Sequence, residues 1–233
     1  MSGKLYGIGV GSGDPEEITI KAVKTIEKCD AIIVPLSMRG KRSQAYRAIE
    51  SYLANQDIIE MYFPMITDKK VLFEQWDKNI NELVTHLEEG KQLGFVTIGD
   101  VSIYSTFAYI MDGVKEKGFD VELISGIPSF CSIAAKRGKS LCEWDEPLLI
   151  YPSNYQTDKI EYYLKEFDNV VLMKAAKAFD QIVDQLEEQQ LLDQAYMITK
   201  CGYEEEEICK DLISKKGTKI NYLSTIIVNK KRG

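Results

Sequence analysis

Short, continuous apolar runs alternate along the chain with longer segments in which apolar residues recur every three or four positions. The continuous runs predict buried strands, and the three-to-four spacing predicts amphipathic helices. Strands are expected at 5–10, 31–35, 57–62, 93–98, 121–124, 148–151, 170–174, 194–201 and 225–229. Helices are expected at 15–29, 43–53, 69–89, 106–117, 157–167 and 179–189, with a further amphipathic segment at 206–214.

This alternation predicts an α/β fold with two domains. Strands that are apolar throughout, each followed by a helix, are typical of a mainly parallel sheet covered on both faces. Residues 126–147 show no clear strand and are expected to carry the crossing between the halves, and the pattern beyond them is more hairpin-like. We therefore expect an N-terminal domain at 1–124, a C-terminal domain at 125–233 and an active site in the cleft between them.

Four alternating glycines end the first predicted strand, in the sequence GIGVGSGDP at 7–15. Glycine allows positive φ and a close backbone approach, which suits a strand end that borders a site. The spacing fails the dinucleotide fingerprint G-x-G-x-x-G, whether counted from Gly7 or from Gly9. Asp14, which precedes Pro15, has two open interpretations, as a helix N-cap and as a carboxylate at the site.

Two further loops follow predicted strands, GDVSIYST at 99–106 and SGIPSF at 125–130. Each lies between a strand and the next predicted element, so its side chains are expected at the carboxyl edge of the sheet, where open α/β folds bind ligands. Turn chemistry is the alternative for each loop, with Ser105 or Thr106 serving as a helix cap. Three such loops in one chain favour a binding site.

Charge and composition exclude several classes. The net charge of −7 argues against nucleic acid as the main partner. The sequence contains no apolar run of the roughly 20 residues that a membrane span needs and no signal-peptide pattern, so no membrane association and a cytoplasmic location are expected. Five scattered cysteines and one histidine predict free thiols and no protein-bound metal.

A local basic cluster could still receive an anionic ligand. Arg39, Lys41, Arg42 and Arg47 follow the second predicted strand, and Lys136, Arg137 and Lys139 form a second group. A solvated surface run is the alternative for either group.

The order of these motifs resembles the tetrapyrrole methyltransferases of cobalamin biosynthesis. The match is carried by residues 7–15, 99–106, 126–130 and 222–227, and so spans nearly the whole chain. The Phe63-Pro64-Met65 segment, the long helix after it and YLSTII at 222–227 look most like the branch that methylates C20 of precorrin-2 or cobalt-factor II.

The resemblance implies two α/β domains, a homodimer and S-adenosylmethionine bound in the cleft. If the binding residues of that family are transferred to the matching positions here, the methionine and ribose end of the cofactor would lie against Gly99, Asp100, Val101, Ile103, Ser105 and Thr106. The adenine would lie against Phe130, Cys131, Met173 and Thr225. The family usually has proline at the positions of Ser12 and often of Val101, and these departures affect loop stiffness and add one backbone donor.

The chemistry needs few side chains, because the sulfonium is already an activated electrophile and must chiefly be aligned with a nucleophilic carbon. Asp100 is the first candidate for a base or a stabiliser of positive charge, and Asp14 is the second. A tetrapyrrole substrate carries many carboxylates, for which Arg39, Arg42 and Arg47 are candidate partners. Contacts to this substrate are also expected from Gly11, Ser12, Tyr104 and Tyr155.

Other functions stay open from the sequence. One is a different member of the superfamily, acting at another ring carbon, on uroporphyrinogen III or on diphthine. Another is a tetrapyrrole-binding module without catalysis. The sequence does not decide between the metal-free precorrin and its cobalt form.

Overall fold

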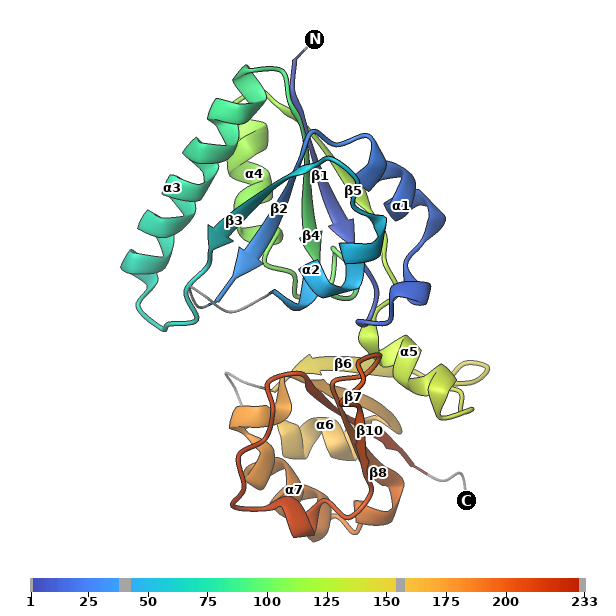
Figure 1. Ribbon diagram of the computed structural model, residues 1–233. Helices are drawn as coiled ribbons and strands as arrows, with labels where there is room; N and C mark the ends of the chain where they lie inside the picture. The colour runs from blue at the N-terminus through green and yellow to red at the C-terminus, as the bar shows by residue number, and fades with distance from the viewer. Residues whose placement is uncertain (1, 38–42, 154–157, 231–233) are drawn as a thin grey trace. The chain divides into compact units, whose positions relative to one another are not determined.

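The computed structural model describes residues 2–37, 43–153 and 158–230. It divides into two compact units, the first ending at Ser129 and the second beginning at Phe130 (Figure 1). Each unit has its own sheet and its own core.

The first unit is built on a five-stranded sheet in the order β3-β2-β4-β1-β5. Every neighbouring pair is parallel, so the carboxyl ends of the strands share one edge, as the continuous apolar runs predicted. The strands are β1 (Lys4–Gly9), β2 (Ala31–Leu36), β3 (Asp57–Tyr62), β4 (Gln92–Thr97) and β5 (Asp120–Ile124).

Helices cover both faces of this sheet (Figure 1). Successive residues of a strand point to opposite faces, so Leu5 joins one core and Tyr6 the other. The first core lies under the long α3 and α4, and the second lies under α1 and α2. The helices are α1 (Ile20–Glu27), α2 (Gln44–Ile49), α3 (Lys69–Glu88) and α4 (Ala108–Glu116).

The helix expected at 15–29 is wrong as a single element. The chain forms a short 3-10 helix at Pro15–Glu17 and then α1. Thr19 separates the two, because its backbone is extended and its Oγ1 accepts a hydrogen bond from the Ala22 N–H at 3.1 Å. A threonine in this role is an N-cap, which starts a helix rather than continuing one. The helix expected at 43–53 likewise ends early, giving way to a 3-10 turn at Glu50–Tyr52.

The second unit has a mixed sheet in the order β6-β7-β10-β8-β9. The β6–β7 pair is parallel and the other three pairs are antiparallel, which agrees with the hairpin-like pattern of the sequence. The strands are β6 (Leu148–Pro152), β7 (Asn169–Met173), β8 (Ala195–Thr199), β9 (Glu207–Cys209) and β10 (Ser224–Asn229). The helices are α5 (Ser129–Lys136), α6 (Ile160–Glu166) and α7 (Phe179–Glu188), with 3-10 turns at Ala175–Lys177, Leu192–Gln194 and Ile213–Lys215.

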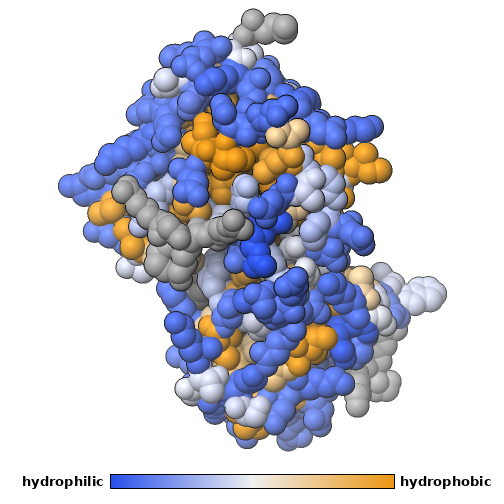
Figure 2. Space-filling view, in the orientation of Figure 1, coloured by the Kyte–Doolittle hydropathy of each residue, from blue (hydrophilic) through white to orange (hydrophobic). Residues whose placement is uncertain are grey.

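The amphipathic segment expected at 206–214 forms a strand and a turn. β9 takes up its first part by pairing with β8, and the 3-10 turn at Ile213–Lys215 follows. The face drawn in Figure 2 is largely hydrophilic in both units, with hydrophobic residues in separate patches. Within the described ranges, no helix combines the length and the apolar character that crossing a membrane would require.

Three glycines let the loops after β1, β4 and β5 pack backbone against backbone. A Cβ atom on Gly9 would lie 2.6 Å from the Gly126 nitrogen and 2.7 Å from the Gly99 carbonyl oxygen. A Cβ on Gly126 would collide with the same carbonyl and with the backbone of Gly9. Separations this short do not occur at real Cβ atoms, so these positions exclude every side chain.

This packing predicts a large cost for Gly9→Ala. The added methyl group meets backbone atoms, which cannot rotate away, so the free energy of unfolding should fall by about 3 kcal/mol. Gly118→Ala is the control, because Gly118 has φ +88° and open space around its Cβ position. Its cost should be only about 1 kcal/mol, from the left-handed backbone. Chemical denaturation measures both, and equal losses for the two variants would contradict the prediction.

Candidate active site

The loops after β1 and β4 are joined directly. Gly11 and Gly99 form an isolated antiparallel bridge, with the Gly99 N–H donating to the Gly11 carbonyl at 2.7 Å and the Gly11 N–H donating back at 3.3 Å. Both residues have positive φ, +79° and +76°, which glycine adopts without strain. The sequence placed these two glycines in separate motifs, and the bridge brings the motifs together at one sheet edge.

Asp100 links this pair to the third loop. Its Oδ1 accepts hydrogen bonds from the Ser102 N–H at 2.8 Å and the Ser102 hydroxyl at 2.5 Å, and its Oδ2 accepts from the Gly126 N–H at 2.9 Å. The side chain is buried, with 9% exposure. Burial alone would raise the pKa of Asp100, but the hydrogen bonds from Ser102 and Gly126 outweigh it and hold the pKa below its ordinary value.

Sequence reasoning missed the partners of Asp100. Ser102 follows two residues after an aspartate, which is the spacing of an Asx-turn and could have been read from the sequence. The Gly126 N–H lies far along the chain, on the loop after β5, and only the order of strands brings it to Asp100. The carboxylate therefore acts as a clamp between two of the three loops.

Two residues of the first loop have local partners. The Ser12 side chain is buried, and its hydroxyl donates to the Glu17 carboxylate. Asp14 caps the 3-10 helix at Pro15–Glu17, its Oδ1 accepting from the Glu16 N–H at 3.0 Å. This is the N-cap interpretation of Asp14. A site role for either residue stays a prediction, and it would have to coexist with these contacts.

The remainder of the 99–106 loop divides between core and surface. Val101 packs into the core beneath α3 and α4, so only its backbone can meet a ligand. The Ser105 hydroxyl donates to Thr97 Oγ1 at 3.2 Å and accepts from the Phe107 N–H at 3.1 Å, which is the turn chemistry considered above.

Tyr104 stands out in this loop, with a left-handed backbone at φ +49° and a side chain 42% exposed. A non-glycine residue in this conformation carries strain, and such strain gathers at functional sites. Burial of part of the ring raises the pKa of its hydroxyl. Ile103 and Thr106, on either side of it, are half-buried.

The first basic cluster is only partly described. Arg39, Lys41 and Arg42 lie outside the described residues, as does Tyr155. Arg47 is exposed on α2. In the second basic cluster, Lys136 pairs with Glu206 at 3.1 Å and the Arg137 guanidinium lies 5.5 Å from the centre of the Tyr196 ring. These contacts give Lys136 and Arg137 partners within the second unit.

The second unit brings two further predicted residues to one sheet edge. Met173 ends β7, and Thr225 lies near the start of the neighbouring β10. Leu172 and Ile226 are paired and point into the core, so Met173 and Thr225 both point to the opposite face. Two of the four residues that the resemblance assigned to adenine therefore share a face and an edge.

Two buried serine hydroxyls of the second unit have no partner among the described residues, and that of Ser153 lies near this edge. The Ser153 N–H donates to the Met173 carbonyl at 2.8 Å, yet the fully buried Ser153 hydroxyl has no hydrogen-bond partner among the described residues. The same holds for the Ser132 hydroxyl on α5, which follows the buried Phe130 and the exposed Cys131. Buried hydroxyls of this kind are suited to hydrogen bonding with a polar ligand.

In the described part of the chain no three His, Cys, Asp or Glu side chains are placed to hold a metal ion.

The family follows from a comparison with known proteins. Residues 4–216 match the model of the Tetrapyrrole (Corrin/Porphyrin) Methylases. The chain belongs to this family. This confirms the family that the motif order of the sequence indicated. The role of the joined loops in binding stays a prediction.

Two relatives are named as methyltransferases, and a solved structure shares the fold. A probable cobalt-precorrin-2 C(20)-methyltransferase of Methanocaldococcus jannaschii is 42% identical over 73% of this chain and 72% of its own. A cobalt-precorrin-2 C(20)-methyltransferase of Salmonella typhimurium is 29% identical over 99% of this chain and 98% of its own. A uroporphyrin-III C-methyltransferase of Thermus thermophilus, solved with S-adenosylhomocysteine, shares the fold with a TM-score of 0.72, 13% identity and 97% coverage of each chain.

The Asp100 clamp makes a prediction for Asp100→Asn. An amide can still accept from Ser102, but its NH₂ group would face the Gly126 N–H, donor against donor. The free energy of unfolding at neutral pH should fall by about 2 kcal/mol. Because the pKa of Asp100 is lowered in the folded protein, this contribution is present above the unfolded-state pKa and is lost as the pH falls through the folded-state value.

Denaturation curves at several pH values measure this difference. Asp14→Asn is the matched control, since asparagine caps helices as well as aspartate does, and its stability should be close to that of the unmodified protein. A gap between Asp100→Asn and the unmodified protein that persists unchanged in strong acid would argue against the clamp.

Proposed function

We propose that this protein transfers a methyl group from S-adenosylmethionine to C20 of precorrin-2 or cobalt-factor II. The observation that carries the proposal is the 42% identity to a relative named for this reaction, together with a second relative of the same name that aligns over nearly the whole chain. The Phe63-Pro64-Met65 segment and YLSTII at 222–227 favour the same branch.

The cofactor fits the residues present. In the first unit, the joined glycine loops offer backbone groups and one fixed carboxylate, and the methionine and ribose end would lie there. In the second unit, the adenine would lie against the face shared by Met173 and Thr225, where the unpartnered Ser153 hydroxyl is nearby. When bound, S-adenosylmethionine supplies an electrophilic methyl group on a positively charged sulfur.

Asp100 suits positioning better than proton transfer. All three of its hydrogen bonds favour the ionised form, and a carboxylate with a lowered pKa is a weak base near neutral pH. Its negative charge is held in place before any ligand arrives, so it can stabilise a cation without reorganising. We therefore assign Asp100 to binding and electrostatic stabilisation.

The anionic rim of the substrate would be met by cations and by Tyr104. Arg47 is exposed on α2, which follows β2 in the same sheet as the glycine loops, and Arg39 and Arg42 remain proposed partners from the sequence. Tyr104 presents a partly exposed ring in a strained loop, which is suited to stacking on a macrocycle.

We also propose that the protein is a cytoplasmic homodimer. An aromatic patch on α3 and α4 supports the dimer. Trp76 and Tyr109 stack with ring centres 4.4 Å apart, and Phe73 packs edge-on against Trp76 at 5.2 Å. Phe73 and Tyr109 are 55% and 48% exposed, and exposed aromatic clusters are typical of protein interfaces.

The proposed reaction can be tested directly. Purified protein incubated anaerobically with S-adenosylmethionine should add one methyl group to precorrin-2 or to cobalt-factor II, seen as a single mass increase with the new carbon at C20 by NMR. The relative rates on the two substrates identify the metal-free or the cobalt route. Uroporphyrinogen III serves as the control substrate and should gain no methyl group.

Binding without turnover would contradict this function and favour a binding module. Methylation of uroporphyrinogen III, or of another carbon, would keep the family and overturn the branch. Calorimetric binding of S-adenosylhomocysteine, measured in parallel, shows whether an inactive sample retains its cofactor site.

The proposed dimer can be tested by a substitution in the aromatic patch. Phe73→Asp places a charge in the aromatic patch and should convert the dimer to a monomer in light scattering after size-exclusion chromatography. Ile20→Asp is the control, because Ile20 is 75% exposed on α1, away from the patch, and should leave the dimer intact. A monomeric unmodified protein, or a dimeric Phe73→Asp variant, would overturn the proposed interface.

A further inference from the structure

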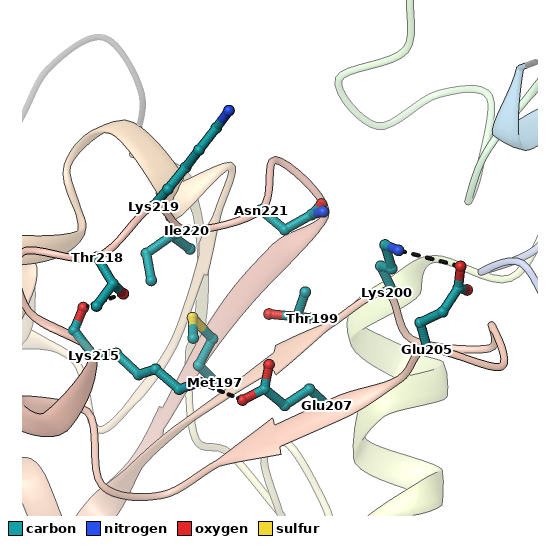
Figure 3. Close-up of a pocket in the computed structure, with 10 residues that line it drawn as sticks. All are labelled: Met197, Thr199, Lys200, Glu205, Glu207, Lys215, Thr218, Lys219, Ile220 and Asn221. Atoms are coloured by element: carbon teal, nitrogen blue, oxygen red, sulfur yellow. Dashed lines mark hydrogen bonds and ion pairs between the residues drawn. The ribbon is translucent and has the colours of Figure 1, made fainter. Parts of the chain in front are cut away.

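A polar pocket of about 240 Å³ lies on the second unit, formed by the ends of β8 and β9 and the segment 215–221 (Figure 3). Its apolar floor is Met197 and Ile220. Figure 3 shows Thr199 between two charged pairs, Lys215 with Glu207 and Lys200 with Glu205. None of these residues has been assigned a role in methyl transfer.

The pocket is separate from the proposed adenine face. Met197 pairs with Ile226 of β10, and both point into the core. Thr225 precedes Ile226 and therefore points to the other side of the sheet. Because Thr199 lies two residues after Met197, it shares the core side, so the pocket opens on the opposite face from Thr225.

The charges in the pocket leave one cation unbalanced. Lys215 Nζ lies 2.6 Å from Glu207, and Lys200 Nζ lies 3.4 Å from Glu205. Among the described residues, Lys219 has no ion-pair partner, and in Figure 3 its side chain extends away from both pairs. Exposed pairs contribute only about 0–1 kcal/mol, so a more highly charged ligand can rearrange them and engage all three lysines.

Neutral donors complete the lining. The Asn221 carbonyl oxygen accepts from the Leu223 N–H at 2.9 Å, which leaves its NH₂ group as a donor. The Thr199 hydroxyl shares a 2.7 Å hydrogen bond with the Ser224 hydroxyl. When Thr199 accepts in that bond, its own O–H can donate toward the pocket. The lining thus combines three ammonium groups, two of them paired with carboxylates, with amide and hydroxyl donors.

We propose that this pocket binds the phosphate group of a small phosphorylated metabolite. Phosphate is close to a dianion at neutral pH and accepts hydrogen bonds in several directions, which matches separate lysine point charges better than a planar carboxylate does. The volume is too small for a macrocycle or for the whole methyl donor, since common ligand pockets begin at about 300 Å³. The inference is independent of the methyl-transfer function.

Calorimetric titration with inorganic phosphate tests the proposal. The full-length protein is titrated at constant ionic strength, with chloride as the balancing salt. Phosphate should bind saturably with one site per chain, and Lys219→Glu should weaken binding at least about tenfold, because it replaces the unbalanced cation with an anion. Among the described residues, the Lys219 side chain makes no hydrogen bond or ion pair, so the variant should fold normally, as its melting temperature will show.

Lys177→Glu is the matched control, an exposed lysine of the same unit outside the pocket, and it should bind phosphate like the unmodified protein. Acetate and glycerol 3-phosphate replace phosphate in separate titrations, and only the phosphorylated ligand should bind as well as phosphate. Absence of saturable binding, equal weakening by Lys177→Glu and Lys219→Glu, or equal affinity for acetate would overturn the proposal.

Discussion

The close approach of three backbones at the ends of β1, β4 and β5 is the constraint on which the first unit depends. Gly9 and Gly126 leave no space for a Cβ atom, because each would meet the Gly99 carbonyl oxygen and each other's backbone, so the loops pack main chain against main chain. This brings the Gly126 N–H to the Asp100 carboxylate. The glycines therefore serve first to bring the loops together, and any approach to a ligand follows from that packing.

Holding Asp100 in this way has an electrostatic consequence. A buried carboxylate is ordinarily protonated more readily, yet here three donated hydrogen bonds lower its pKa and keep it charged. A fixed negative charge at a sheet edge is a feature that a cationic methyl donor can use directly. The same bonds occupy the oxygen atoms that a general base would need, so the residue is better suited to orienting and stabilising than to removing a proton.

The second unit carries its two proposed sites on opposite faces of one sheet. Strand alternation directs Met173 and Thr225 to one side of its sheet and Met197 and Thr199 to the other. One side carries the residues expected to hold adenine, and the other carries the lysine-lined pocket. Because the two sets of residues point to opposite faces, each set can be altered by substitution without removing residues of the other.

The sequence by itself determined the positions of every described strand except β9, the parallel sheet of the first unit, the three glycine loops and the family, because these depend on local apolar runs and short motifs. It did not determine where the helix at 15–29 breaks, because Thr19 can cap a new helix or continue an old one, and the choice depends on how α1 packs. It also missed β9, since a three-residue strand is defined by its pairing with β8. Only the tertiary structure decided which group binds Asp100 and which lysines lie together. The order of the strands brings the Gly126 N–H to Asp100. The return of the chain past the ends of β8 and β9 places Lys215 and Lys219 beside Lys200.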